Sequence, residues 1–195
     1  METRSSIIFV TGGVRSGKSS FAEKLAIKYA QDERAELHYI ATAIITDAEM
    51  EERIIRHQQN REAQKVKWNS YEKPVDIGEL AAVFSKKDVI LLDCLTVLVN
   101  NVLFFQDKKQ EGIERKLKKD LIELSRSCRY LILVSNEVTY EPSLDLFVQK
   151  YCRILNQLHY FLVQHANEAY LVENGIAQRK KGDKNEGCDD TRDFI

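Results

Sequence analysis

The residues whose types and spacing most clearly indicate a chemical role form a glycine-rich loop near the N-terminus. The loop reads Gly12-Gly13-Val14-Arg15-Ser16-Gly17-Lys18-Ser19 and fits the pattern G-x-x-x-x-G-K-[ST], between an apolar run over 7–11 and a helical pattern over 21–29. Glycines let backbone N–H groups turn toward phosphate oxygens, and the N-terminus of a helix adds partial positive charge. Lys18 is placed to reach the β- and γ-phosphates, and the Ser19 hydroxyl to bind Mg²⁺. An accidental glycine-rich turn is the alternative, but the strand before the loop and the helix after it favour a nucleotide site.

Asp93 is a second candidate ligand for Mg²⁺. It closes the apolar run over 89–92, at the position where phosphate-loop enzymes carry a metal-binding carboxylate. A carboxylate just past a buried strand is also an ordinary N-cap for a following helix. The two roles are compatible, and the sequence leaves both open.

His57 is a candidate functional residue because of its position in a predicted helix. It follows Met50 by seven residues and Ile54 by three, so it shares their face of a helix that a capping-box spacing opens at Thr46. Arg61 lies four residues further on. Taken alone, this position fits a structural histidine better than a functional one.

Five short β-type runs alternate with helical patterns, and this alternation determines how the candidate residues are positioned. The runs cover 7–11, 37–43, 88–93, 130–135 and 169–173. Four of them are nearly continuous in apolar residues, which is typical of a sheet covered on both faces. Helical patterns occupy 21–29, 113–124 and 144–162. We therefore predict an α/β fold with a mostly parallel sheet and flanking helices, of the RecA-like phosphate-loop NTPase type, with ligands at the carboxyl ends of the strands.

The chain is predicted to form one domain over residues 1–177. No Pro/Gly/Ser-rich linker interrupts it, and there is no internal repeat. From Gln178 to Ile195 the pattern stops, and five basic and five acidic residues replace the large apolar ones. We expect residues 178–195 to be a mobile charged tail.

Composition excludes several classes of protein. The 195 residues carry 29 Lys and Arg against 30 Asp and Glu, a net charge of -1, so no overall field attracts nucleic acid or an anionic membrane. The longest apolar runs are far shorter than the ~18 residues of a membrane span, and the N-terminus has no secretory signal pattern. We expect a cytoplasmic protein. The four cysteines are too far apart for a zinc motif and are expected to be reduced thiols, three of them buried.

The sequence resembles the adenosylcobinamide kinase/adenosylcobinamide-phosphate guanylyltransferase family of cobalamin biosynthesis. The resemblance begins with the phosphate loop, whose Gly-Gly and Arg-Ser-Gly-Lys-Ser form is narrower than the general pattern. It continues in family order through about residue 175. The further landmarks are Tyr39-Ile40-Ala41-Thr42, Glu49-Met50, Arg53-Ile54, His57, Asp93-Cys94-Leu95-Thr96, Asn100-Asn101, Ser135-Asn136-Glu137-Val138 and Asn156-Gln157.

The resemblance implies two reactions. The family phosphorylates the aminopropanol hydroxyl of adenosylcobinamide with ATP or GTP, and then transfers GMP from GTP to that phosphate through a guanylylated histidine. The loop from Gly12 to Ser19 would bind nucleotide phosphates, Lys18 would act in catalysis, and Ser19 and Asp93 would serve Mg²⁺. His57 would be the nucleophile, because a neutral imidazole can attack phosphorus, and Arg61 would offset phosphate charge. The remaining nucleotide contacts implied are Ile40, Ala41, Thr42, Gln58, Gln59, Asn60, Arg61 and Glu72.

Two departures from the family pattern keep other functions open. Glu62 stands where the family usually has proline, and Thr139-Tyr140-Glu141-Pro142 replaces a glycine-containing loop. The alternatives are a small-molecule kinase that has lost guanylyl transfer and a nucleotide-binding module without chemistry. The resemblance also implies a homotrimer and a corrinoid substrate, and the near-zero net charge predicts no nucleic-acid partner.

Overall fold

The computed structural model describes residues 5–45, 66–105, 112–138 and 145–182, together with positions 48, 52, 54, 55, 59 and 61. Strands and helices alternate along most of these residues, as the sequence predicts, but the structure has seven strands where the sequence predicts five. In chain order the elements are β1 (Ser6–Gly12), α1 (Lys18–Glu33), β2 (Leu37–Ala41), β3 (Asn69–Glu72), the 3₁₀ helix η1 (Ile77–Ala82), β4 (Val89–Asp93), α3 (Leu95–Phe105), α4 (Ile113–Ser127), β5 (Tyr130–Asn136), α5 (Leu146–His165), β6 (Glu168–Glu173) and β7 (Ile176–Lys181).

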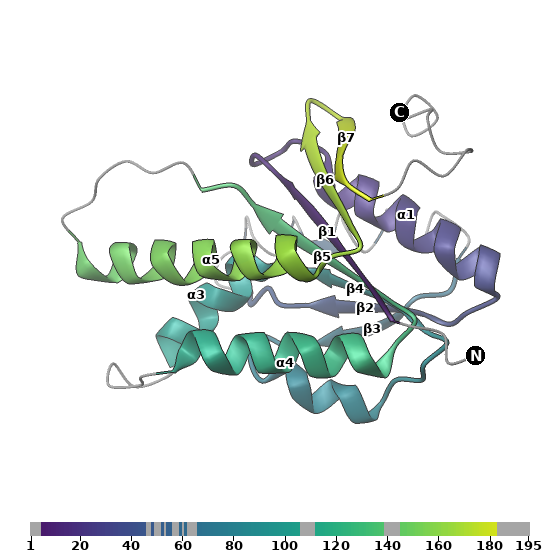
Figure 1. Ribbon diagram of the computed structural model, residues 1–195, viewed down its shortest axis with the longest axis horizontal. Coiled ribbons are helices and arrows are strands. Elements are labelled where there is room, and N and C mark those ends of the chain that lie inside the picture. The colour runs from purple at the N-terminus through teal and green to yellow at the C-terminus, as the bar shows by residue number, and fades with distance from the viewer. Residues whose placement is uncertain are drawn as a thin grey trace.

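The strands form one seven-stranded sheet in the order β3-β2-β4-β5-β1-β6-β7 (Figure 1). All neighbouring pairs are parallel except β6 and β7, which are antiparallel. The carboxyl ends of the six parallel strands therefore meet at one edge. The predicted fold class, a mostly parallel sheet with flanking helices, is confirmed.

Helices cover both faces of the sheet, which explains the continuous apolar strands. α1 lies on one face, whereas α3, α4 and α5 lie on the other (Figure 1). Side chains alternate along each strand, so Ile8 and Val10 of β1 face α1, while Ile7 and Phe9 face α4 and α5. Two apolar layers result, and the sheet is buried between them.

The sequence predicts that the domain ends at residue 177, but this is wrong, because the next four residues still belong to its sheet. Gln178 to Lys181 belong to β7 and pair with β6, and Arg179 donates hydrogen bonds to Glu168 (3.2 Å) and to Tyr170 Oη. Only Ala177 of this strand is buried, so β7 is a polar edge strand without an apolar pattern to mark it. Residues 183–195, the rest of the expected tail, lie outside the described residues.

The structure also contains elements without a counterpart in the expected pattern. β3 and η1 are short, and α3 is apolar at eight of its eleven positions, so none of them shows a clear helical or strand period. The second expected strand ends at Ala41 and not at residue 43. The helix expected after Thr46 falls mostly outside the described residues.

Two of the three described cysteines, Cys128 and Cys152, are buried, and Cys94 is partly exposed. All three are free thiols, whereas Cys188 lies outside the described residues. Among the helices that the structure describes, none combines the length and apolarity needed to cross a bilayer.

A half-buried histidine makes the stability of this fold depend on pH. His159 of α5 lies against Phe9, and its Nε2 is 2.7 Å from Oγ of Ser135. Burial lowers the pKa of His159 to about 4 from 6.5. Between these values the unfolded chain binds a proton that the folded chain does not, so the free energy of unfolding decreases as pH falls from 6.5 to 4.

We expect His159→Gln to remove this part of the pH dependence, which amounts to about 3 kcal/mol at most. The measurement is urea unfolding of wild type and variant across that pH range. His165→Gln is the matched control, because His165 is exposed in the last turn of α5, and this variant should keep the wild-type profile. A His159→Gln profile parallel to wild type would contradict the prediction.

Candidate functional site at the carboxyl edge of the sheet

The phosphate loop joins β1 to α1 and requires glycine at its first position. A Cβ on Gly12 would lie 2.2 Å from the carbonyl oxygen of Val172 in β6 and 2.7 Å from Ser16 Oγ. The loop is therefore packed against the neighbouring strand. Gly17 precedes α1 with a φ of 91°, a conformation that glycine adopts without strain.

Lys18 is folded over this loop. It is the first residue of α1, its side chain is buried, and its Nζ donates a hydrogen bond to the Gly13 carbonyl at 3.2 Å. Val14 and Arg15 are exposed at the tip, and Ser19 is half-buried in the first turn of α1. The amino end of the helix and a buried ammonium thus lie at one concave turn, the arrangement that binds phosphate.

The strand register places the other predicted residues at the same edge. Ala41 of β2 pairs with Asp93 of β4 on one side and with Glu72 of β3 on the other. Gly12 pairs with Asn136 at the end of β5, between β4 and β1. The predicted residues of β1 to β4 therefore converge at the edge where ligands of such sheets bind.

Asp93 accepts a hydrogen bond from a tyrosine that the sequence does not single out. The hydroxyl of Tyr39, in β2, lies 3.2 Å from Asp93 Oδ2. Burial and the Asp93 charge raise the pKa of Tyr39 well above its usual range, so the hydroxyl remains a donor. Cys94 occupies the position directly before α3, and its carbonyl accepts from the Leu98 amide, so Asp93 is not the N-cap that the sequence offers as an alternative.

Thr42 fixes the turn that follows Asp93. Its Oγ1 donates to the Cys94 carbonyl and accepts from the Cys94 amide, both at 2.9 Å. Asn101 donates to the Thr42 carbonyl at 2.7 Å. Ile40 and Thr42 are fully buried, backbone included, so half-buried Ala41 is the residue of this segment that is open to a ligand. Burial and Asp93 raise the pKa of the Cys94 thiol, which disfavours a reactive thiolate.

Arg61 lies in the interior and not on the surface. Its Nη1 is 3.4 Å from Oε1 of Glu23, and its guanidinium carbon lies 3.7 Å from the ring centre of Tyr39. Arg61, Glu23 and Tyr39 are each at most 6% exposed. The arginine is thus neutralised by a carboxylate of α1 and stacked on the same tyrosine that binds Asp93.

Several predicted residues cannot be placed with these. His57, Gln58 and Asn60 lie outside the described residues, as do the departures at Glu62 and 139–142. Gln59 is exposed, and Glu72 is exposed at the end of β3. Among the described residues near His57 in the sequence, Arg61 is connected to the carboxyl edge through its contact with Tyr39.

Sequence reasoning missed two residues of this site. Tyr39 stands within a motif that the resemblance quotes, but its contact with Asp93 depends on the pairing of β2 with β4. Glu23 is a carboxylate among the buried positions Ala22 and Ala26 of α1, and this departure from the apolar pattern is the signal that marks it.

The donor chemistry of the edge fits Mg²⁺. Ser19 offers a hydroxyl and Asp93 a carboxylate, and Mg²⁺ in nucleotide sites takes one or two such groups together with phosphate oxygens and water. The hydrogen bond from Tyr39 uses one lone pair of Asp93, which leaves others for a cation.

Comparisons with known proteins agree with this geometry. The model of the family described as cobinamide kinase / cobinamide phosphate guanyltransferase matches residues 8–180. The chain is 32% identical over 188 residues to the bifunctional adenosylcobalamin biosynthesis protein CobU of Escherichia coli, covering 90% of this chain and 99% of that one. It is 31% identical over 179 residues to the bifunctional adenosylcobalamin biosynthesis protein CobP of Pseudomonas aeruginosa, covering 89% and 96%.

Similar solved structures share the fold at low identity. The flagellar accessory protein FlaH of Methanocaldococcus jannaschii superposes with a TM-score of 0.52 at 14% identity, over 91% of this chain and 79% of that one. The KaiC-like protein PH0186 of Pyrococcus horikoshii gives 0.50 at 13% identity, over 93% and 81%. These neighbours support the phosphate-loop NTPase fold alone.

The buried Arg61 generates a prediction about stability. Arg61→Met should lower the free energy of unfolding by roughly 3–5 kcal/mol, because the buried Glu23 would lose the compensating charge of Arg61. Glu23→Gln added to Arg61→Met should restore part of the loss. The measurement is urea unfolding, with Gln59→Met as the control because Gln59 is exposed two residues away. Equal midpoints for Arg61→Met and Gln59→Met would contradict the assignment.

Proposed function

Because this chain belongs to the cobinamide kinase / cobinamide phosphate guanyltransferase family, we propose that it phosphorylates adenosylcobinamide and then joins GMP to that phosphate. ATP or GTP supplies the phosphate, and GTP supplies GMP. The observation that carries the proposal is the convergence of the phosphate loop, Asp93 and the Arg61 contact at one edge of the sheet. The relatives named as bifunctional adenosylcobalamin biosynthesis proteins support the same pair of reactions.

In the first reaction the phosphate loop positions the nucleotide. Backbone N–H groups from Gly12 to Ser19 and the Lys18 ammonium bind the β- and γ-phosphates and stabilise the charge that develops during transfer. The aminopropanol hydroxyl of the corrinoid attacks the γ-phosphorus, the bond from this phosphorus to the β-phosphate oxygen breaks, and the hydroxyl proton passes to solvent. Positioning and charge stabilisation provide most of the catalysis in such transfers.

Ser19 and Asp93 would hold Mg²⁺ through a hydroxyl and a carboxylate oxygen, and the bound ion would supply positive charge to the phosphates. Tyr39 orients the Asp93 carboxylate by its hydrogen bond. Orienting groups of this kind fix the geometry of a ligand before the metal arrives.

In the second reaction His57 is the nucleophile. A neutral ring nitrogen attacks the α-phosphorus of GTP and pyrophosphate leaves; the phosphate oxygen of the corrinoid then attacks the same phosphorus, and the P–N bond breaks. Ala41, Glu72 and the stretch from Gln58 to Arg61 remain proposed nucleotide contacts, whereas the fully buried Ile40 and Thr42 would act by positioning Ala41. The burial of Arg61 and its ion pair with Glu23 of α1 favour a positioning role for this arginine.

We also propose that the protein acts in the cytoplasm and has no nucleic-acid partner. We further propose that it forms a homotrimer. An apolar patch supports association: Phe104 and Phe105 at the end of α3 are 70% and 64% exposed, and Phe104 lies 5.2 Å from the ring of Phe147 in the first turn of α5. Leu146, beside Phe147, is 78% exposed. Apolar surface of this kind is typical of interfaces between protein chains.

Tyr39→Phe tests the orientation of Asp93. Losing the hydroxyl should raise the Mg²⁺ concentration for half-maximal phosphorylation about tenfold, because the carboxylate loses the donor that orients it. Mn²⁺ binding to the nucleotide complex, followed by electron paramagnetic resonance, should weaken in parallel. Tyr71→Phe, a matched change in the neighbouring strand β3, should leave both curves unchanged, and equal curves for the two variants would refute the role of Tyr39.

The guanylylation of His57 is tested with GTP labelled at the α-phosphate. The label should become attached to the chain, survive alkali and be lost in acid, because protonation of the phosphoramidate nitrogen improves the leaving group. His57→Ala should abolish labelling and spare the kinase reaction, which needs only the phosphate loop to position the γ-phosphate.

His38→Ala is the informative comparison for that experiment. His38 is a buried histidine of β2, 3.2 Å from Asp88, and its removal should leave the label in place. Undiminished labelling of His57→Ala would assign the nucleophile elsewhere. Kinase activity without any label in wild type would mean that guanylyl transfer is absent from this chain.

The oligomeric state is tested by light scattering after size exclusion. The trimer should have three times the chain mass of 22.6 kDa, and Phe104→Ser should shift it toward single chains because the apolar patch is weakened. Val83→Ser is the control, since Val83 is 55% exposed outside this patch. A wild-type protein that elutes as single chains would contradict the proposal.

A further inference from the structure

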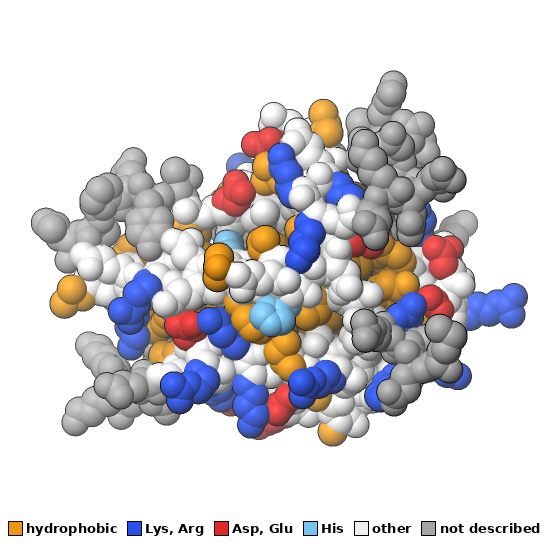
Figure 2. Space-filling model, in the orientation of Figure 1, with side chains coloured by type: hydrophobic (Ala, Val, Ile, Leu, Met, Phe, Trp, Pro, Cys, Tyr) orange, Lys and Arg blue, Asp and Glu red, His pale blue; other side chains and the backbone are white. Residues whose placement is uncertain are grey.

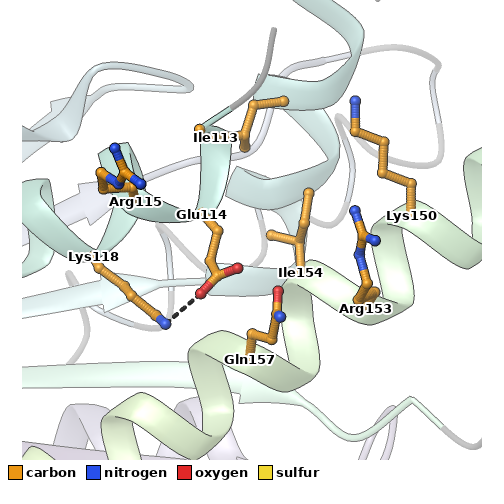
Figure 3. Close-up of a pocket in the computed structure, with 9 residues that line it drawn as sticks. Ile113, Glu114, Arg115, Lys118, Lys150, Arg153, Ile154 and Gln157 are labelled. Carbon is orange, nitrogen blue, oxygen red and sulfur yellow. Dashed lines mark hydrogen bonds and ion pairs between the residues drawn. The ribbon is translucent and has the colours of Figure 1, made fainter.

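A pocket lies away from the phosphate loop, between the start of α4 and the first half of α5. Its volume is about 590 Å³, a size suited to a small molecule. Ile113 and Ile154, both buried, provide apolar lining, and the polar side chains around them come from both helices (Figure 3). None of its lining residues belongs to the site described above.

The lining of this pocket is strongly basic. Arg115 and Lys118 come from α4, and Lys150 and Arg153 from α5. Glu114 is the one carboxylate among the described lining residues, and it forms an ion pair with Lys118. The pocket therefore carries four cations against one anion, whereas the whole chain has a net charge of -1. Figure 2 shows basic side chains gathered over the same ends of the two helices.

The amino end of α4 adds to this positive potential. Gly112 caps this 15-residue helix with a φ of 96° and without a side-chain hydrogen bond to its first turn. The amides of residues 113–115 precede the first intrahelical bond, which the Lys116 amide makes to the Gly112 carbonyl. N–H groups in this position attract anions, and here they adjoin the four cationic side chains.

The described contacts leave the outer cations available. Arg115 and Arg153 are exposed, and Lys150 is half-buried. Within the part of the chain that the structure describes, none of these three forms an ion pair, in contrast to Lys116 and Lys118 on the same helix. Like charges this close repel one another, and a polyvalent anion between them would remove that repulsion.

We propose that this pocket binds a small phosphate-bearing anion, outside the catalytic site. Two arginines from facing helices can each offer a pair of parallel N–H donors to a phosphate group, and Gln157 adds an amide. The concave shape favours a compact ligand over an extended surface. Pyrophosphate and the phosphate tail of a nucleotide share this chemistry. The proposal does not rest on the catalytic function.

Hydrogen exchange followed by mass spectrometry tests the site on the full chain, with pyrophosphate as the probe. Pyrophosphate should slow exchange in peptides covering 112–118 and 150–157, in addition to any protection at the phosphate loop. Arg115→Gln/Arg153→Gln should weaken the protection of the two helical peptides at least tenfold in pyrophosphate concentration and leave that of residues 12–19 unchanged. Higher salt should weaken binding as well.

The matched control is Arg34→Gln/Arg126→Gln, which removes two exposed arginines outside the pocket and should behave as wild type. GTP and guanosine identify the source of the phosphate: stronger protection by GTP than by pyrophosphate assigns a nucleotide, and the reverse assigns the free anion. Protection by guanosine equal to that by GTP would overturn the proposal. So would protection confined to residues 12–19, or protection of the helical peptides that persists in Arg115→Gln/Arg153→Gln.

Discussion

A buried guanidinium connects the parts of the proposed active site. Burying the charge of Arg61 is costly unless a carboxylate and a polarisable face compensate it, and Glu23 and Tyr39 supply both. Glu23 belongs to α1, the helix that begins at Lys18, and Tyr39 donates a hydrogen bond to Asp93. One charge thus ties Arg61, four residues after His57 in the sequence, to the helix of the phosphate loop and, through Tyr39, to the proposed metal ligand.

The parallel sheet makes this connection possible. Strands that run in the same direction end at the same edge, so residues as far apart in sequence as Gly12 and Asp93 come together without a dedicated loop. The loop after β1 is further constrained by β6, whose Val172 carbonyl leaves no room for a side chain at position 12. A phosphate can therefore reach the backbone of the loop only with this strand order and with glycine at position 12.

The sequence predicted the parts of this arrangement that depend on local patterns. The phosphate loop, the five predicted strands and the carboxyl edge as the ligand site each follow from a short motif or a period. β3 and β7 were missed because these edge strands are polar, and α3 because it is apolar at eight of its eleven positions and shows no clear helical period. β7 also corrects the expected domain boundary.

The role of Arg61 shows where reasoning from sequence stopped. From the sequence alone, an arginine four residues after a candidate nucleophile is interpreted as a phosphate contact. The sequence does not reveal its partner Glu23, because the two are 38 residues apart and only the packing of α1 brings them together. Tyr39 was missed for the same reason, since its contact with Asp93 crosses from one strand to another. Long-range pairs of buried polar groups leave little trace in a single sequence.

The central claim is that one carboxyl edge carries both transfers, and product analysis tests it most directly. Purified protein is incubated with adenosylcobinamide, GTP and Mg²⁺, and the corrinoids are separated over time. The account predicts that a phosphate ester appears first and is converted to a product that carries GMP joined through that phosphate. Accumulation of the ester alone would contradict the second transfer, and nucleotide binding without any corrinoid product would contradict both.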